Sequence, residues 1–446
     1  MKKFIFLLVF CLKLFASEEI EVSLQSKSIL SPLYLSNIQN IASNFEDKYL
    51  SQIYDVFFFD LNFSGYAKVI NDNKKYNTQL FNFNSELAFD KNFWKNENVS
   101  FLVKIKASSS YLKIYLYDNK NDLLNEEKID LSGNINLDRN EIHKLSSKII
   151  ELFFNEKSIF DIKILYTLRK DITISKSVSE IFLCDFDGEN QKQLTFDNDY
   201  HVHPVFIPKK NERSSDFIYV SYQNGQPKIY KKSLFSNEKK PIISLPGNQL
   251  LPSICKNFEK IAFICDAAGR PDLFIQNFNN ELKAEGKPIQ LFSYPRATQA
   301  SSTFSPDGKK IAFVSDKDGT PRIYSINLEE YSYRKRPDAK LITKKNRHNV
   351  TPSWSKDGKK IAFSATTDGV RQIWIYDFEL DEELQLTKGS INKENPCWAP
   401  NNLHIVFNTE NSKESELYII NINQKEAVKI TKGQHRKRFP VFEPYM

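Results

Sequence analysis

Glycine is scarce in this sequence, with 13 residues in 446, and none of them begins a Gly-x-Ser-x-Gly motif. That motif places the nucleophile of many serine hydrolases on a sharp turn between a strand and a helix. No two glycines stand two positions apart, so the Gly-x-Gly-x-x-Gly loop of dinucleotide-binding proteins is absent too. His-Glu-x-x-His is also missing. The sequence therefore carries none of these three enzyme signatures.

Cysteine is rarer still, and none of the five residues belongs to a Cys-x-x-Cys pair, which argues against a zinc or thiol-redox site. Cys11 falls in the N-terminal apolar stretch, and the other four lie in apolar, strand-like runs: Cys184, Cys255, Cys265 and Cys397. An even number of cysteines permits disulfides in an oxidising compartment but does not require them. We expect buried free thiols.

The apolar stretch at the N-terminus is short. Lys2 and Lys3 are followed by apolar residues from Phe4 to Leu12, and Lys13 comes next. This stretch is too short to span a bilayer. A basic tip and a short apolar core predict a signal peptide over residues 1–16, cleaved after Ala16.

The chain is only mildly basic. Its formal charge is +7, and removal of residues 1–16 takes away three lysines and no acid, which leaves 7 − 3 = +4. Such a weak charge gives no reason to expect nucleic-acid binding. Two local clusters, Arg334–Arg336 and Arg436–Arg438, are interpreted as solvated loops, with attraction of an acidic partner or an anionic surface as the alternative.

A repeat occupies the rest of the chain. "TFSPDGKKIAFVSDKDGTPRIYSINL" (303–328) has a near copy in "TPSWSKDGKKIAFSATTDGVRQIWIYDF" (351–378), and looser copies surround both. One position before the first strand aligns across six copies, at Pro204, Pro252, Ser302, Pro352, Pro396 and Pro440. The steps between these positions are 48, 50, 50, 44 and 44 residues. A strand-only repeat of this length is typical of a β-propeller blade.

Six second strands can be counted, beginning near Ile164, Ile218, Ile261, Ile311, Ile361 and Ile405. The first has no proline-containing strand before it, whereas the last repeat is followed by a spare strand, "FPVFEPYM" (439–446). We therefore expect the C-terminus to supply the missing inner strand of the first blade. The prediction is a six-bladed propeller over residues 158–446, closed so that no sheet edge stays open.

Residues 17–157 carry no such repeat and predict a small α/β domain. Residues 136–154 have apolar side chains at helical spacing, with Asp138 placed to cap the helix. Residues 99–118 predict a strand hairpin, while Ile38–Phe45 and Leu50–Phe58 are interpreted as helical or mixed segments. The fold class is mainly β, with an α/β N-terminal domain.

Several segments together resemble one family. They are "DLNFSG" (60–65), the linker helix and first strand (142–170), "DFDGENQKQLT" (185–195) and the closing "FPVFEPYM". In these segments, and in the order of signal peptide, small domain and six repeats, the chain resembles the TolB family of periplasmic propeller proteins of the Gram-negative Tol–Pal system. The resemblance covers nearly the whole chain after the signal peptide. One departure is that Ser-Pro-Asp-Gly is intact only at 305–308.

The resemblance implies a non-enzymatic periplasmic scaffold. It would link a Pal-like peptidoglycan-associated lipoprotein of the outer membrane to a TolA-like protein of the inner membrane. Its role would be to support outer-membrane integrity and constriction during cell division. A monomer that meets membranes only through partners is expected, with no catalytic residue, cofactor or metal. The alternative is a propeller enzyme, a cofactor-dependent dehydrogenase or a hydrolase, with its active site in the central channel.

The resemblance also implies two partner-binding sites. The lipoprotein is expected over the propeller mouth, on residues that precede the aligned prolines: His203, Asn248, Gln249, Thr298, Gln299, Asn349, Thr351 and Glu394. The TolA-like protein is expected on an extended N-terminal strand: Glu19, Ile20, Glu21, Val22, Ser23 and Leu24. The alternation of apolar and polar residues in that strand suits addition to an exposed sheet edge.

Two short patterns suggest metal ligands. His201 and His203 lie two apart and could share a face, but no third ligand is near in sequence, so a packed or partner-facing pair is expected. Asp185-x-Asp187-Gly188 imitates the start of a calcium loop, whose later ligands are missing. A hairpin turn accounts for this second pattern.

Overall fold

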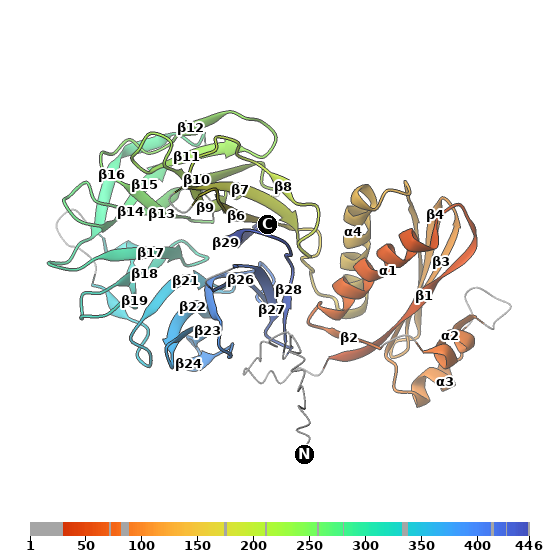
Figure 1. Cartoon of the computed structure of the whole chain (residues 1–446). Helices are drawn as coiled ribbons and strands as arrows, with labels where there is room; N and C mark the ends of the chain where they lie inside the picture. The colour runs from red at the N-terminus through yellow and green to blue at the C-terminus, as the bar shows by residue number, and fades with distance from the viewer. Residues whose placement is uncertain are drawn as a thin grey trace, which may run out of the picture.

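The chain folds into a six-bladed propeller with a smaller α/β domain beside it, as predicted (Figure 1). The computed structural model describes residues 30–70, 73–81, 89–173, 176–209, 212–256, 258–279, 281–331, 338–411, 414–424 and 426–444. The predicted signal peptide, the predicted N-terminal strand and the cluster Arg334–Arg336 lie outside these ranges. No helix within them is both long and apolar enough to cross a membrane.

The N-terminal domain is built on a five-stranded sheet in the order β2-β1-β3-β4-β5. Its strands are β1 (Ser31–Ser43), β2 (Ala67–Ile70), β3 (Phe101–Ser109), β4 (Tyr111–Asp118) and β5 (Leu123–Asp130). Helices α1 (Asp47–Asn62) and α4 (Ile135–Phe154) share a hydrophobic core with one face, and α2 (Lys74–Phe81) and α3 (Lys91–Asn96) share a smaller one with the other. Both faces are buried because successive side chains of β1, such as Leu33 and Tyr34, enter opposite cores.

The structure corrects two local predictions in this domain. Most of Ile38–Phe45 belongs to strand β1, which pairs with β3 as far as Ser43. The cap of helix α4 is Asn134, whose side chain accepts from the Asn136 amide at 3.0 Å. Asp138 does not cap the helix because it lies inside the first turn, where its buried carboxylate accepts from the Tyr49 hydroxyl at 2.6 Å. The predicted hairpin (β3–β4) and the linker helix α4 are confirmed.

Each blade of the propeller is a four-stranded antiparallel sheet, and we number the blades in chain order. Blade 1 holds β6 (Lys163–Asp171), β7 (Ser177–Asp185), β8 (Lys192–Gln193) and the C-terminal β29 (Arg436–Phe442). Blade 2 holds β9 (His201–Phe206), β10 (Asp216–Ser221), β11 (Lys228–Ser233) and β12 (Lys239–Pro241). Blade 3 holds β13 (Gln249–Ile254), β14 (Lys260–Cys265), β15 (Asp272–Phe278) and β16 (Ala284–Phe292).

The remaining blades repeat this plan. Blade 4 holds β17 (Gln299–Phe304), β18 (Lys310–Ser315), β19 (Arg322–Asn327) and β20 (Lys340–Leu341), with a 3₁₀ turn at Leu328–Glu330. Blade 5 holds β21 (Asn349–Trp354), β22 (Lys360–Thr367), β23 (Val370–Asp377) and β24 (Glu382–Gln385). Blade 6 holds β25 (Asn392–Trp398), β26 (His404–Glu410), β27 (Leu417–Asn421) and β28 (Ala427–Lys429).

The second strand of each blade is apolar at nearly every position because neighbouring blades cover both of its faces. In β18, Ile311, Ala312 and Phe313 are all fully buried. They divide between two cores, one shared with blade 3 and one with blade 5. Of the four cysteines predicted as free thiols, three are buried, and Cys397 is partly exposed on the channel.

The C-terminal strand closes the ring, as the spare strand in the sequence predicted. β29 pairs antiparallel with β6, with Phe442 opposite Ile164, and the Glu443 amide donates to the Lys163 carbonyl at 2.8 Å. The cluster Arg436–Arg438 is therefore not a solvated loop. Lys437 is fully buried on Glu416 of blade 6, at 2.9 Å, which helps to tie the last blade to the first.

Candidate functional site at the propeller axis

A channel runs along the propeller axis between the six inner strands. Two cavities, of about 230 and 170 Å³, lie end to end along this axis. They share one lining residue from each blade: Val205, Pro252, Thr303, Ser353, Cys397 and Val441. We call the end where the chain enters the inner strands the entry mouth, lined by His203, Leu251, Ser301, Thr351, Asn395 and Phe439. The end where the chain leaves them is the exit mouth, and it holds the larger cavity.

The entry mouth has an unusual backbone. In five of the six blades its residue has a left-handed conformation, with φ between 51° and 54°: His203, Leu251, Thr351, Asn395 and Phe439. Each of the five precedes one of the aligned prolines and lies where the pairing to the second strand shifts register. Such bulges bend a strand and redirect its side chains. The entry mouth is therefore a ring of side chains set by a fixed backbone geometry.

Two of the residues predicted to bind the lipoprotein line this mouth. The imidazole of His203 packs at a tilt against Phe439, with ring centroids 3.9 Å apart, and desolvation of the half-buried ring lowers the pKa of His203 to about 4. It is therefore neutral at pH 7. The Thr351 hydroxyl lies 3.3 Å from the Ser364 hydroxyl on the next strand.

Three more predicted residues surround the mouth, Asn248 and Thr298 on loops that enter the inner strands and Glu394 within strand β25. The Asn248 side chain donates to Asp266 at 2.7 Å, and Glu394 forms an ion pair with Arg371 at 2.7 Å. Thr298 is exposed, and its amide donates to Asp316 at 2.7 Å. These residues remain accessible at the surface while their loops are held in place by hydrogen bonds.

The last three predicted residues, Gln249, Gln299 and Asn349, have side chains no more than 1% exposed. They occupy one position of the repeat, together with His201, Lys393 and Lys437. In Gln249 the side-chain amide donates to the carbonyls of Ile243 and Leu245, in the loop from the preceding blade. The side-chain amide of Asn349 likewise donates to the carbonyl of Asn346, in the loop that precedes its strand. This position shapes the loops from within and offers no surface to a partner.

The two histidines do not converge on a metal. His201 is buried against Asp197, with Nε2 2.9 Å from the carboxylate, whereas His203 points to Phe439. Within the described residues one group could hold a cation, His143 with Asp185 and Asp187. Arg139 already forms an ion pair with Asp187, and Lys163 lies 2.6 Å from Asp185. The carboxylates are thus neutralised by the chain itself, and Asp185–Gly188 forms the expected turn, with the Gly188 amide donating to the Asp185 carbonyl at 2.9 Å.

The segments 60–65 and 185–188 meet at the junction between the two domains, which sequence reasoning did not identify as a site. His143 of α4 lies 2.8 Å from Asp60 and 3.6 Å from Asp187 of the propeller. Phe59 and Phe186 pack edge to face with ring centroids 6.0 Å apart. Segments 60–65 and 185–188 both belong to the family pattern found in the sequence. Their occurrence in one pattern is the signal that could have indicated a contact between them.

His404 is the second anchor of this junction. Its Nε2–H donates to the carbonyl of Phe63 at 2.6 Å, and its Nδ1 accepts from the Asn401 side chain at 2.9 Å. The bond that Nδ1 accepts requires the neutral ring, whereas the bond to Phe63 can be made by the protonated ring as well. Burial lowers the pKa of His404 to about 4, although the bond to Phe63 opposes this. The turn between β25 and β26 follows the last residue of inner strand β25 and so lies at the exit mouth. Because His404 at the end of this turn contacts Phe63, the N-terminal domain sits on the side of the exit mouth.

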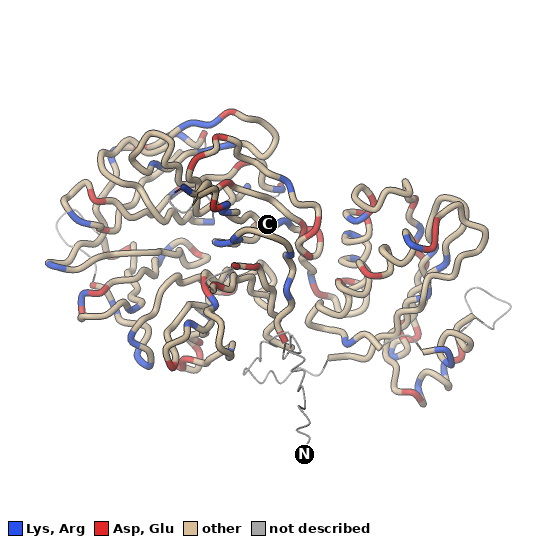
Figure 2. Tube along the Cα trace, viewed as in Figure 1, with Lys and Arg blue, Asp and Glu red and all other residues tan. Residues whose placement is uncertain are grey.

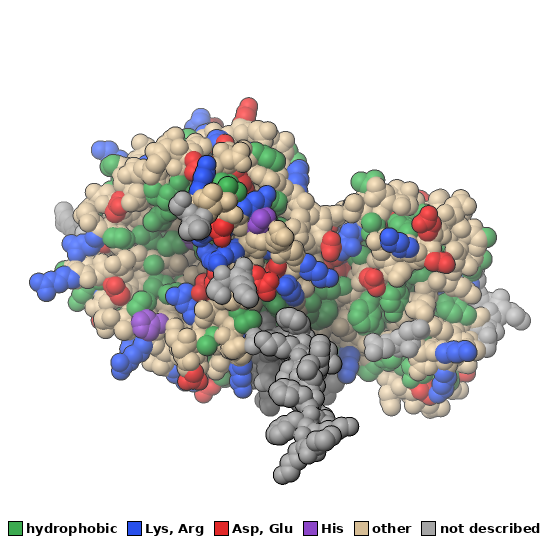
Figure 3. All heavy atoms as spheres, in the orientation of Figure 1, with side chains coloured by type: hydrophobic (Ala, Val, Ile, Leu, Met, Phe, Trp, Pro, Cys, Tyr) green, Lys and Arg blue, Asp and Glu red, His purple; other side chains and the backbone are tan. Residues whose placement is uncertain are grey.

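Charge is spread evenly over the molecule. Lys and Arg alternate with Asp and Glu along both domains in Figure 2, and the face in Figure 3 shows no large area of one sign. This distribution fits recognition by shape and hydrogen bonding better than by long-range attraction.

Comparisons with known proteins agree with this architecture. Residues 150–446 match the family described as the TolB beta propeller domain. A protein named TolB homolog from Protochlamydia amoebophila is 43% identical over 403 residues, which cover 87% of this chain and 86% of that protein. A TolB homolog from Chlamydia muridarum is 32% identical over 66% of this chain and 63% of its own length. The crystal structure of TolB from Acinetobacter baumannii has the same fold, with a TM-score of 0.75 at 21% identity, covering 96% of this chain and 100% of that one.

Proposed function

The chain belongs to the TolB family, and from this premise we propose that it is a non-enzymatic, periplasmic scaffold of a Tol–Pal type envelope complex. It joins a Pal-like peptidoglycan-associated lipoprotein to a TolA-like inner-membrane protein. Through this link it supports outer-membrane integrity and constriction at division. The observation that carries the proposal is the entry mouth, an open ring of one residue per blade with a fixed backbone.

The chemistry of the channel favours a scaffold over an enzyme. The ionisable residues that line the two cavities are His203, Lys256, Lys356, Cys397 and Glu443. Desolvation raises the pKa of the Cys397 thiol, so it is not a ready nucleophile, and neither lysine is hydrogen-bonded to it. Glu443 is held by Arg213 at 2.8 Å, and His203 is packed against a phenylalanine. These groups do not form the nucleophile–base pair that covalent catalysis uses. A bound chromophore or a hydrolytic activity in the purified protein would instead favour the enzyme.

We assign the entry mouth to the lipoprotein. Its accessible polar groups, His203, Thr298, Thr351 and Glu394, surround a cavity of about 170 Å³. Since few of them are charged, the contact is expected to be hydrogen-bonded and wet. Gln249 and Asn349 contribute by holding the loops through their buried side-chain amides, whereas the buried side chain of Gln299 makes no hydrogen bond within the described residues.

Replacing His203, Thr298, Thr351 and Glu394 together by Ala should weaken lipoprotein binding about tenfold to a hundredfold, as expected when a few central contacts supply most of the energy. Binding of the purified lipoprotein is measured by calorimetry. The control replaces Glu281, Lys283, Glu285 and Lys287, four exposed residues at the rim of blade 3, by Ala. Equal affinity in the two quadruple variants, with both folded, would remove the assignment.

We assign the TolA-like partner to residues 17–28, which lie outside the described residues. Their alternating pattern is able to add a strand to a partner's sheet. If the segment also docks on its own body, lipoprotein binding could bias which state is populated, provided that the lipoprotein prefers one of them.

Deleting residues 17–26 should abolish binding of the inner-membrane partner and leave lipoprotein affinity and melting temperature unchanged. A second variant, Ile20→Ser with Val22→Ser and Leu24→Ser, keeps the length and removes only the apolar face. Both variants are compared in pull-downs with the partner's soluble domain. Partner binding that survives the deletion would contradict the assignment.

A further inference from the structure

The exit mouth is a ring of six equivalent positions, each two residues beyond the end of an inner strand: Pro208, Lys256, Pro306, Lys356, Pro400 and Pro444. All six line the cavity of about 230 Å³. In blade 4 the proline belongs to the intact Ser-Pro-Asp-Gly turn, and blade 5 has Ser-Lys-Asp-Gly in its place. Proline satisfies the turn in four blades, so the fold itself does not require lysine in the other two.

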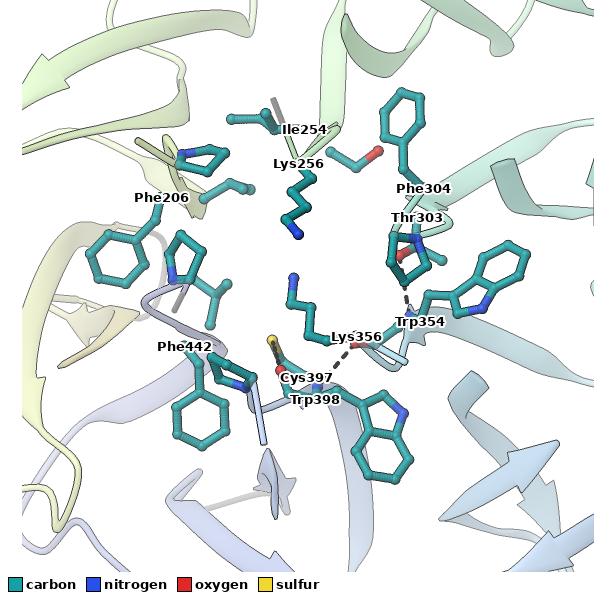
Figure 4. Close-up of a pocket in the computed structure, with 18 of the residues that line it drawn as sticks. Phe206, Ile254, Lys256, Thr303, Phe304, Trp354, Lys356, Cys397, Trp398 and Phe442 are labelled. Atoms are coloured by element: carbon teal, nitrogen blue, oxygen red, sulfur yellow. Dashed lines mark hydrogen bonds between the residues drawn. The ribbon is translucent and has the colours of Figure 1, made fainter. Parts of the chain in front are cut away.

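Both lysines point into the cavity. Figure 4 shows Lys256 of blade 3 and Lys356 of blade 5 extending into the cavity, with their ammonium groups directed toward each other. Neither ammonium has a hydrogen bond or ion pair with any residue in the described part of the chain. Both side chains are exposed to solvent in the cavity. Desolvation by the surrounding walls lowers the pKa of Lys356, an effect opposed by Cys397 and reinforced by the charge of Lys256. Two like charges that face each other in this way raise the energy of the empty cavity.

The wall of the cavity is apolar. The last residue of each inner strand contributes a large side chain: Phe206, Ile254, Phe304, Trp354, Trp398 and Phe442. The carboxylate in the lining, Glu443, accepts from Arg213 at 2.8 Å and from the Ser214 amide at 3.2 Å, and Arg213 also forms an ion pair with Asp161. Glu443 is thus held by the wall and forms no ion pair with either lysine, so the cavity combines two ammonium groups with an aromatic surface.

We propose that the exit mouth binds a carboxylate between Lys256 and Lys356, with the apolar group that carries it packed on the aromatic wall. A carboxylate presents two oxygens, one for each ammonium, and charge-assisted hydrogen bonds of this kind are about twice as strong as neutral ones. The carboxylate belongs either to a short free dicarboxylic acid or to a glutamate of a polypeptide segment. The site is at the opposite end of the channel from the entry mouth, so it does not depend on the proposed function.

The test measures binding by calorimetry at low salt with four probes. They are glutarate, inorganic phosphate, the blocked peptide acetyl-Phe-Glu-Gly-Glu-amide, and the same peptide with Gln in place of Glu. Lys356→Pro recreates the turn of blade 4. If the Lys356→Pro variant fails to fold, Lys356→Gln is used in its place. Lys256→Gln and the double variant complete the set, with exposed Lys388→Gln as the charge-matched control.

We expect a carboxylate probe to bind the native protein, each single variant to lose about tenfold in affinity, and the double variant to lose binding. Lys388→Gln should bind as the native protein does, and added salt should weaken binding. Binding of glutarate indicates a free acid, and binding of the Glu peptide alone indicates a polypeptide segment. Four results would each overturn the proposal. They are binding of phosphate alone, equal binding of the Gln and Glu peptides, unchanged binding in the double variant, and no binding of any probe.

Discussion

Deleting residues 439–446 should abolish cooperative folding of the propeller. The deletion removes half of β29 and so leaves the edge of β6 unpaired where Val441 and Phe442 now lie opposite Leu165 and Ile164. Phe442 is only 4% exposed, and loss of a buried phenylalanine alone costs about 3–5 kcal/mol. A typical domain is stable by about 5–15 kcal/mol, so the loss of closure as well exceeds what the fold can tolerate.

The measurement is thermal unfolding followed by circular dichroism and by limited proteolysis. A chain that lacks only residues 445–446 keeps all of β29 and serves as the control. The same unfolding temperature in the two truncated proteins would show that β29 is not needed for closure.

Acidification should loosen the junction between the domains. The pKa of His404 is about 4 in the folded protein, against an ordinary value of 6.5, because the ring is buried. Between these values the unfolded chain binds the proton and the folded one does not. The contribution of neutral His404 to the free energy of unfolding is therefore complete above pH 6.5 and is lost as the pH falls to about 4. A difference of this size corresponds to about 3 kcal/mol.

His404→Gln should remove this part of the pH dependence, since Gln can donate to the Phe63 carbonyl but does not titrate. The matched control is His203→Gln, because desolvation lowers the pKa of His203 to about 4 as well, but His203 lies at the entry mouth and not at the junction. Unfolding free energies are compared at pH 7 and pH 4.5, together with cleavage of the linker at residues 155–158. If both variants protect the linker equally at pH 4.5, His404 is not the pH-sensitive anchor.

The blades could be predicted from sequence because their spacing and turn chemistry are local. Pro306-Asp307-Gly308 marks a turn, and the period between the aligned prolines sets the blade length. Closure followed from counting, since a strand without a partner at one end of the chain matched a missing strand at the other. Strand β1 was harder, because its apolar residues serve two cores and therefore show no clear alternation.

The burial and orientation of individual side chains along the propeller axis could not be predicted from the repeat. Alignment placed Gln249 and Thr351 near the mouth, but it could not show that a shift of two residues along an inner strand separates a buried position from the channel lining. The paired lysines at the exit mouth belong to blades 3 and 5 and approach each other only when the ring is closed. Their relation depends on the curvature of the whole propeller, which no single repeat contains.

The pairing of β6 with β29 also has a consequence for the order of folding. The Lys163 amide and the Glu443 carboxylate are 280 residues apart in sequence and 3.3 Å apart in space. Contacts between residues so far apart in sequence form slowly, because the chain between the two residues must be closed into a loop before the contact can stabilise the fold. The first blade is thus the earliest part of the propeller to be synthesised and the last to be completed. Until the final residues reach the compartment where the propeller folds, β6 pairs with β7 on one edge and is unpaired on the other, and a chaperone that covers this edge would prevent aggregation.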